Sequence, residues 1–276
     1  RDWQEHLFNE LGRFAPREAV LDTAAWEDVE LREFLRLRLD CRCELGREED
    51  FAPDRAMETA RKQFRTGLED LPGEAEAAVR ACGGLLIYLY ETQKTDLSHL
   101  TAFRYYTGGE FMELDLTARR NLELTETMRG KEKKGSLLWV LDKTRTAMGH
   151  RLIRSWMERP LLSPVQVNKR LDAVEDLVGD AIARQEIAEC LREVTDLERL
   201  IGRIVYGTAG ARDLVALSGG LGKLPRLRAL LAPFRSSLLT VLRESIDDLQ
   251  DLREHIARAL VEEPPFSVRE GGFIKA

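Results

Sequence analysis

The sequence has no long apolar run, few cysteines and no excess of basic residues. Its longest uninterrupted apolar stretch, Leu85–Tyr90, holds six residues, whereas a helix that crosses a bilayer needs about 20. We therefore expect no membrane-spanning segment and no membrane partner. The four cysteines in 276 residues are too few for a disulfide-stabilised secreted domain. They favour a reducing compartment, so the expected location is cytoplasmic.

Metal ligands are also scarce. Cys41 and Cys43 would share one face of a strand, but no neighbouring cysteine or histidine completes the four ligands that a structural zinc site requires. The four histidines lie far apart in the sequence and form no His-x-x-x-His pair. The sequence therefore predicts no metal site, and these side chains are interpreted as packing or surface residues.

The charge balance is acidic, with a formal net charge of −6 from 42 basic and 48 acidic residues. A surface that binds nucleic-acid phosphates depends on many Lys and Arg side chains, so this balance argues against such a surface as the main feature. The acidity is uneven, because residues 1–96 hold 14 basic and 22 acidic residues while residues 97–276 hold 28 and 26. A protein partner is the expected contact of the acidic part.

Phosphate-loop and nucleophile motifs are missing as well. Gly219–Lys223 comes nearest to a Walker A loop, but Leu217 stands where the first glycine belongs and Leu224 stands where Ser or Thr would hold magnesium. The stretch is better explained as a helix with small residues at a close crossing. Ser136 lacks the flanking glycines of a nucleophile elbow and is predicted to cap a helix. The sequence predicts no catalytic, cofactor-binding or metal-binding residue in this chain.

What is present in residues 1–96 is a mixed pattern of helices and short strands. Apolar spacing predicts helices over residues 2–14 and 27–37. Ala19–Leu21 and Leu39–Leu45 read as strands, and Pro53 opens a further helix. This part is predicted to be an incomplete α/β domain.

Residues 97–276 are predicted to be almost wholly helical. Gly108-Gly109 between two apolar stretches indicates a β-hairpin at the junction, over about residues 102–114. Pro225 should kink one long helix near the end of the chain. The last helix, about Arg235–Glu262, would be of order 35–40 Å long at 1.5 Å per residue. The fold class is therefore mainly α, a partial α/β domain followed by an all-α part with long helices.

The segment from Leu114 to Leu162 resembles the MutS family of DNA mismatch-repair proteins. It contains LDLTARRNLEL from Leu114, GSLLWVLDKT from Gly135 and TAMGHRLIRSW from Thr146, and closes with Pro160-Leu161. Further matches to the family are Asp196–Leu200, Arg212–Leu214 and the stretch Tyr90–Thr95, which is similar to the family's link between connector and core.

The resemblance implies a particular part of a longer protein. It places residues 1–96 in the family's connector domain and residues 97–276 in its helical core with lever helices, ending before the clamp that crosses the DNA. The mismatch reader, the clamp and the ATPase domain would lie outside this chain, as the start at Arg1 in place of Met also suggests. The fragment itself is then not an enzyme, whereas the parent would use ATP and magnesium.

The leading hypothesis is a non-catalytic connector–core fragment that transmits conformational change between clamp and ATPase. The implied partners are mismatched duplex DNA through absent domains, a MutL-type protein through the connector, and a second copy in the parent homodimer. Arg119, Arg120 and Asn121, in the most family-like helix, are candidate interdomain contacts. Two alternatives remain open: a self-contained helical adaptor unrelated to repair, and a nuclease that would have to use Asp22 and Asp40 at the weak strands.

Overall fold

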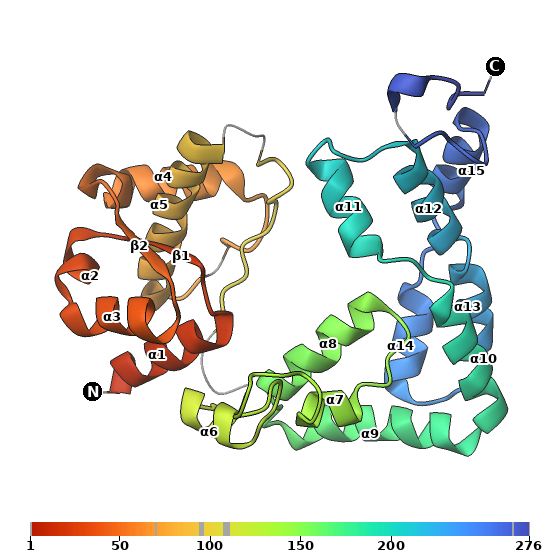
Figure 1. Cartoon of the computed structure of the whole chain (residues 1–276), viewed down its shortest axis with the longest axis horizontal. Coiled ribbons are helices and arrows are strands. Elements are labelled where there is room, and N and C mark those ends of the chain that lie inside the picture. The colour runs from red at the N-terminus through yellow and green to blue at the C-terminus, as the bar shows by residue number, and fades with distance from the viewer. Residues whose placement is uncertain (1, 70, 94–96, 107–110, 267, 276) are drawn as a thin grey trace. The chain divides into compact units, whose positions relative to one another are not determined.

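The computed structural model describes residues 2–69, 71–93, 97–106, 111–266 and 268–275. The chain divides into two compact units (Figure 1). The first unit comprises Arg1–Gly108 with Glu113–Ala118, and the second comprises Gly109–Met112 with Arg119–Ala276. Within the described residues, no helix is long and apolar enough to cross a membrane.

The first unit is built around two parallel strands, β1 (Glu18–Leu21) and β2 (Arg42–Leu45), in which Glu18 pairs with Arg42 and Leu21 with Leu45. Helical segments precede and connect them: α1 (Asp2–Phe14), α2 (Thr23–Glu27), α3 (Val29–Glu33) and a π-helical turn (Phe34–Arg38). The expected helix over residues 27–37 is thus interrupted, because the Asp28 side chain accepts the Leu31 N–H and starts α3 as a new helix.

The core of this unit lies between the connecting helices and the strands. Leu21, Leu31, Leu35 and Cys41 are buried together, and Leu7 and Leu11 of α1 pack against them. Burial raises the pKa of the Cys41 thiol. Cys41 therefore behaves as a small apolar core residue.

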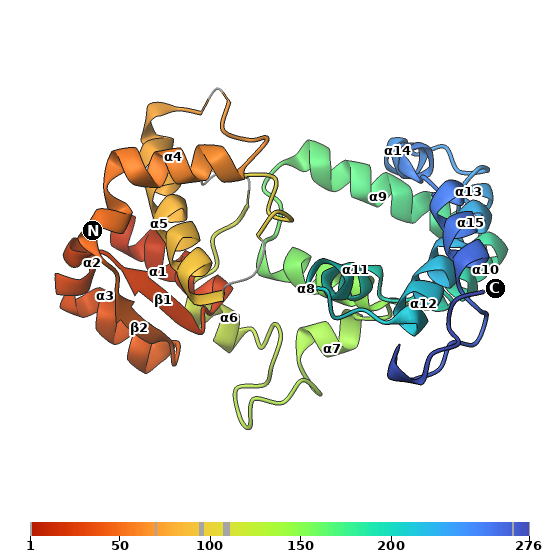
Figure 2. The same cartoon turned by 90° about the horizontal axis from the view of Figure 1, so that it is seen from above.

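Two further helices, α4 (Pro53–Gln63) and α5 (Glu76–Gln93), lie side by side in Figures 1 and 2. Short 3-10 turns, Glu48–Phe51 and Gly73–Ala75, precede them. Their backbones approach closely at Gly83, where an added Cβ would lie 2.0 Å from the Ala56 carbonyl oxygen. On α5, the Tyr88 hydroxyl donates to Glu18 Oε1 at 2.9 Å, so this helix is anchored to β1.

The helix α6 (Leu116–Asn121) spans the division between the units, and the second unit is helical after it. Its helices are α7 (Leu137–Leu141), α8 (Ala147–Glu158), α9 (Pro164–Gly179), α10 (Ala181–Arg192), α11 (Leu197–Val205), α12 (Ala211–Leu221), α13 (Leu224–Leu230), α14 (Ser237–Ser245) and α15 (Gln250–Ala259), with a 3-10 turn at Val268–Glu270. Polar caps set five of these starts, because the side chains of Ser136, Thr146, Ser163, Asp180 and Asp196 each accept a backbone N–H of the first turn.

A second apolar cluster holds this unit together. It consists of Ala173 of α9, Leu231 and Phe234 after α13, and Leu239 of α14, all buried. The Asp176 carboxylate accepts the Ser236 N–H at 2.7 Å, and this bond holds the start of α14 against α9. The backbone hydrogen bond from Ser236 is the main cause that lowers the pKa of Asp176.

The predicted β-hairpin is wrong for the residues that the structure describes. Ala102 pairs in parallel with Thr66, and Phe111 pairs antiparallel with Leu161, so the two flanking stretches bond to different parts of the chain. The glycine pair at 108–109 lies outside the described residues. Local turn chemistry suggested a hairpin, but pairing with distant segments decided the structure.

The predicted long helices are also wrong. The helix expected over Arg235–Glu262 is divided into α14 and α15, and Leu249 has a left-handed φ of 47° directly before α15. The helix expected to kink at Pro225 ends at Leu221, and Pro225 lies in the first turn of α13, where its missing N–H leaves no bond unmade. One apolar stripe runs through α12 and α13, and another runs through α14 and α15. Apolar periodicity therefore could not reveal where each expected helix breaks.

Candidate functional site

The sequence-predicted contact residues lie on α6, where the first unit ends and the second begins. Arg120 and Asn121 are exposed and Arg119 is half-buried. The helix ends at Asn121, and Glu123 follows with a left-handed φ of 46°. α6 is therefore a short helix of six residues.

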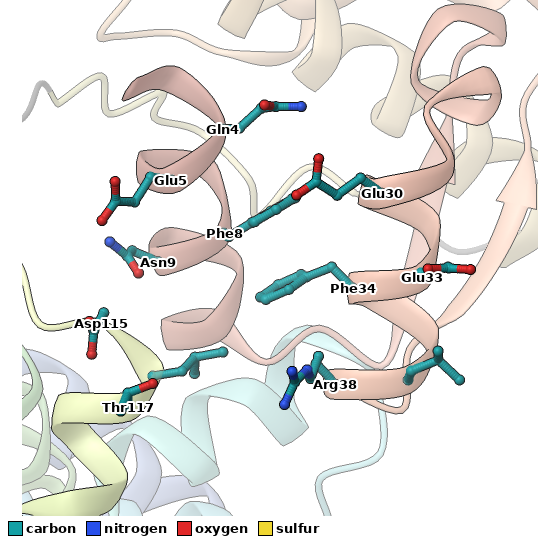
Figure 3. Close-up of a pocket in the computed structure, with 12 residues that line it drawn as sticks. Gln4, Glu5, Phe8, Asn9, Glu30, Glu33, Phe34, Arg38, Asp115 and Thr117 are labelled. Carbon is teal, nitrogen blue, oxygen red and sulfur yellow. The ribbon is translucent and has the colours of Figure 1, made fainter. Parts of the chain in front are cut away.

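A groove of about 910 Å³ in the first unit combines apolar and charged walls (Figure 3). Its walls come from α1, from α3 with the π-helical turn, and from the start of α6. The lining residues are Gln4, Glu5, Phe8, Asn9, Glu30, Glu33, Phe34, Leu37, Arg38, Asp115, Leu116 and Thr117.

The groove has an aromatic floor. Phe8 of α1 and Phe34 of the π-helical turn point toward each other (Figure 3), with ring centroids 4.3 Å apart and ring planes 9° apart. Leu37 extends this apolar surface and is 78% exposed. A π-helical turn is rare and is enriched at functional sites, and here it supplies Phe34, Leu37 and Arg38 to one wall.

The rim of the groove is acidic. Glu5, Glu30, Glu33 and Asp115 line it, against one cation, Arg38. In the described part of the chain, Glu5, Glu30 and Glu33 form no ion pair. An apolar floor with unpaired carboxylates around it suits a protein segment that carries apolar and basic side chains.

Polar contacts and a close approach link α1 to α6 and to the segment that precedes it. His6 Nδ1 lies 2.8 Å from Glu113 Oε2, and the Tyr106 hydroxyl donates to Glu10 at 2.8 Å. An added Cβ on Gly12 would lie 2.5 Å from a methyl carbon of Leu116, so a larger residue there would displace the Leu116 side chain. The third wall of the groove is thus fixed by residues far apart in the sequence.

In the second unit, the family-like stretches bond to one another. Arg151 lies on α8 in the stretch that starts at Thr146, and its Nη2 lies 2.7 Å from Asp196 Oδ1 and 2.5 Å from Glu198 Oε2. The hydrogen bond from Arg151 is the main cause that lowers the pKa of Asp196. Asp213, in the family-like stretch Arg212–Leu214, makes a local bond instead: its side chain accepts the Gly210 N–H at 2.8 Å at the start of α12.

Asp142, after α7, is a second fixed carboxylate. One of its oxygens accepts the Thr144 hydroxyl at 2.6 Å and the Thr144 N–H at 3.0 Å, and the other bonds His150 Nδ1. These bonds, first that from the Thr144 hydroxyl and then that from His150, lower the pKa of Asp142 to about 2. Just before α7, Ser136 is 1% exposed and accepts the Trp139 N–H, which confirms its predicted role as a cap.

The residues considered for a phosphate loop or a nuclease site are bonded to other parts of the chain. Lys223, at the end of the glycine-rich stretch, forms an ion pair with Glu193. Asp22 accepts the Ala25 N–H at 2.8 Å as the cap of α2, and Asp40 lies 3.6 Å from Arg17 in a fully exposed pair. In the described part of the chain, no cluster of three or more His, Cys, Asp and Glu side chains could hold a metal ion.

Comparison with known proteins gives a match over nearly the whole chain. Family models for MutS domain II and MutS domain III match residues 1–101 and 117–276, respectively. The DNA mismatch repair protein MutS of Lachnoclostridium phytofermentans is 40% identical over 271 residues, which are 98% of this chain and 29% of the relative. That of Brevibacillus brevis is 47% identical over 213 residues, 77% of this chain and 24% of the relative.

The first unit and the helical second unit therefore correspond to a MutS connector domain and a MutS core domain. The chain belongs to the MutS family, and the resemblance found in the sequence is confirmed. It spans less than a third of the length of these curated relatives.

Sequence reasoning missed the groove and the Asp142–His150 pair. Phe8 and Phe34 each satisfied a helical apolar pattern, so nothing marked them as floor residues of a cavity. His150 was interpreted as an ordinary surface or packing residue, although Asp142 eight positions earlier offered a partner. Only the turn at Thr144 brings these two side chains together.

Proposed function

We propose that this chain is the non-catalytic connector–core part of a mismatch-recognition ATPase and that it transmits conformational change between a DNA clamp and an ATPase domain. The observation that carries the proposal is the ordered match to MutS domains II and III within relatives more than three times as long. Mismatched duplex DNA, ATP and magnesium would be bound by other parts of the parent, which would act as a homodimer in the cytoplasm.

Exposed apolar surface supports a role inside a larger assembly. The helix α11 is amphipathic, yet none of its residues is buried. Ile201 and Val205, one turn apart, are 52% and 42% exposed. A continuous apolar helix face in water is unusual for a protein that works alone, and it favours packing against further protein.

The transmission itself would run through packed helices. Since the last stretch is two helices and not one lever, a displacement would have to pass from α15 to α12 and from α14 to α9, which are the pairs in contact. Arg119, Arg120 and Asn121 fit interdomain contacts because they begin the second unit directly after the first. A self-contained adaptor remains the alternative, and it would show the same exposed surfaces.

Two assays on the purified chain test the main proposal. We expect no magnesium-dependent ATP hydrolysis above background, and we expect matched and mismatched duplexes to bind equally weakly at about 150 mM salt. Turnover in a clean preparation, or a clear preference for the mismatch in competition, would contradict it. Metal-dependent cleavage of DNA would instead revive the nuclease alternative.

The acidic groove of the first unit, whose walls come mainly from the connector part, is the proposed docking site for a MutL-type partner. The double substitution Glu5→Gln and Glu30→Gln removes two unpaired rim charges. We expect it to weaken association with that partner by about tenfold at low salt, because each exposed charge contributes up to ~1 kcal/mol. Surface plasmon resonance with the chain immobilised would measure the change.

A matched control carries the same charge change elsewhere in the same unit. Glu74 and Glu76 are exposed near the start of α5 and do not line the groove. Glu74→Gln with Glu76→Gln should leave association within about twofold. Equal losses in both pairs would show a general charge effect and would rule out the groove as the site.

A further inference from the structure

A small cavity of about 270 Å³ lies beside α7 in the second unit. Four segments form its walls: the loop before α7, α7 itself, the turn after it, and one face of α8. The lining residues are Thr125, Lys133, Ser136, Leu138, Trp139, Asp142, Lys143, His150 and Arg154. This cavity belongs to no role assigned above.

The cavity has an excess of positive charge. Lys133, Lys143 and Arg154 line it, against one carboxylate, Asp142. That carboxylate already accepts hydrogen bonds from Thr144 and bonds His150, so it is not available to neutralise the lysines. Among the described residues, the Lys133 and Lys143 ammonium groups form no hydrogen bond or ion pair, whereas Arg154 Nε bonds Glu158 at 3.0 Å.

The surroundings strengthen this positive field. Residues 125–154 contain eight Lys and Arg against three Asp and Glu, in a chain whose net charge is −6. Arg129, Lys131, Lys134 and Arg145 also form no ion pair within the described part of the chain. Where basic side chains outnumber carboxylates in this way, the local potential favours binding of an anion.

The charge and the walls together define a ligand. Two free ammonium groups line the cavity beside Arg154, which Glu158 already pairs, and Asp142, which already bonds Thr144 and His150. A phosphate monoester carries about −1.5 to −2 at pH 7 and matches these two free positive charges. Leu138 is buried at 5% exposure and Trp139 is 52% exposed, so one wall is apolar and aromatic. An indole is a stacking surface for a flat ring.

We propose that this cavity binds a small phosphate monoester that carries a flat ring, the chemistry of a nucleoside monophosphate. The phosphate lies between Lys133, Lys143 and Arg154, and the ring lies against Trp139. Duplex DNA does not fit, because 270 Å³ admits only a small ligand. The proposal is independent of the clamp–ATPase transmission role and of the connector groove.

The test is calorimetric titration of the whole chain at low ionic strength with adenosine monophosphate, inorganic phosphate, adenosine and a glutamate-rich peptide. We expect saturable binding in the order adenosine monophosphate, phosphate, adenosine. Absence of saturable binding of the monophosphate would overturn the proposal. So would equal binding of adenosine and adenosine monophosphate, or tighter binding of a glutamate-rich peptide, which would make the cavity an acidic-peptide site.

Two pairs of variants locate the site. Lys133→Gln with Lys143→Gln should weaken binding of adenosine monophosphate by about tenfold, since each exposed ion pair contributes roughly up to fivefold. Lys131→Gln with Lys134→Gln makes the same charge change in the same loop but outside the cavity, and it should change binding by less than about threefold. Equal losses in the two pairs would overturn the assigned site.

The ring contact has its own variant. Trp139→Leu should abolish the preference for adenosine monophosphate over inorganic phosphate and leave phosphate binding unchanged. An unchanged preference would overturn the aromatic part of the proposal. The five mutated side chains are exposed, and far-ultraviolet circular dichroism identical to that of the unmodified chain would confirm that each variant is folded.

Discussion

At the scale of single residues, carboxylates hold much of the second unit in place. Asp142, Asp176 and Asp196 each join segments that are separate in the chain or close a turn. In each case hydrogen bonds stabilise the charged form and lower the pKa of the carboxyl group. The folded state therefore depends on these groups being ionised.

Asp142→Asn tests this dependence. The pKa of Asp142 falls from the ordinary 3.8 to about 2 on folding, so its contribution to stability is fully present above pH 3.8 and is lost as the pH falls toward 2. We expect the free energy of unfolding of the variant to be about 1 kcal/mol lower than that of the unmodified chain at pH 7. Between pH 4 and 2 the variant should lose less further stability than the unmodified chain does. Urea unfolding at a series of pH values would measure both effects.

A suitable control is Asp172→Asn. Asp172 is exposed on α9 and makes no hydrogen bond or ion pair among the described residues. Its stability and acid dependence should match those of the unmodified chain within about 0.5 kcal/mol. The interpretation of Asp142 fails if the two variants behave alike.

The caps among these residues could be predicted from the sequence, and the long-range pairs could not. Ser136 was identified as a cap because a cap bonds the N–H three residues ahead, which is a local relation. The bond of Asp176 to Ser236 joins residues 60 positions apart. No local pattern encodes such a bond, since it depends on how α9 and α14 pack.

At the scale of elements, the glycine-rich helix α12 shows what its small residues do. An added Cβ on Gly220 would lie 2.5 Å from the Thr195 hydroxyl oxygen, whereas one on Gly219 would meet nothing within 4 Å. The close crossing expected from the sequence is therefore confirmed at Gly220 only. Neighbouring positions of one helix face different surroundings.

This contrast gives a paired prediction. Gly220→Ala should destabilise the chain by about 1–3 kcal/mol, because the methyl group has no room. Gly219→Ala should stabilise it by up to about 1 kcal/mol, because alanine has fewer backbone conformations than glycine in the unfolded chain and favours the helix. Chemical denaturation of the two variants would check the signs. A loss of stability in both would contradict the assigned helix face.

Helix periodicity predicted where helices occur better than where they stop. The helix expected over residues 2–14 is observed as α1, Asp2–Phe14. The break before α15 falls at Leu249, an apolar residue that keeps the stripe in phase while its φ is left-handed. Such a conformation is set by tertiary packing, because leucine does not favour it.

At the scale of the whole molecule, each unit has its own apolar cluster. Leu35 is 1% exposed in the cluster of the first unit, and Leu239 is 6% exposed in that of the second. The two clusters share no residue. Separate cores are the basis for separate unfolding transitions.

Leu35→Ala and Leu239→Ala should therefore act on different transitions. Each truncation removes buried methyl groups and should destabilise its own unit by about 2–5 kcal/mol. Differential scanning calorimetry should show one transition shifted by the first substitution and the other by the second. If both substitutions shift a single common transition equally, the units unfold together and the prediction is wrong.

The sequence by itself determined the family, the mainly helical fold class, most helix positions and their caps, because apolar periodicity, capping residues and family motifs are local properties of the chain. The tertiary structure alone decided the partners of Ala102 and Phe111, the breaks at Leu221 and Leu249, the aromatic groove and the cationic cavity. These features depend on contacts between distant segments. Packing energy selects such contacts, and no short stretch of sequence records them.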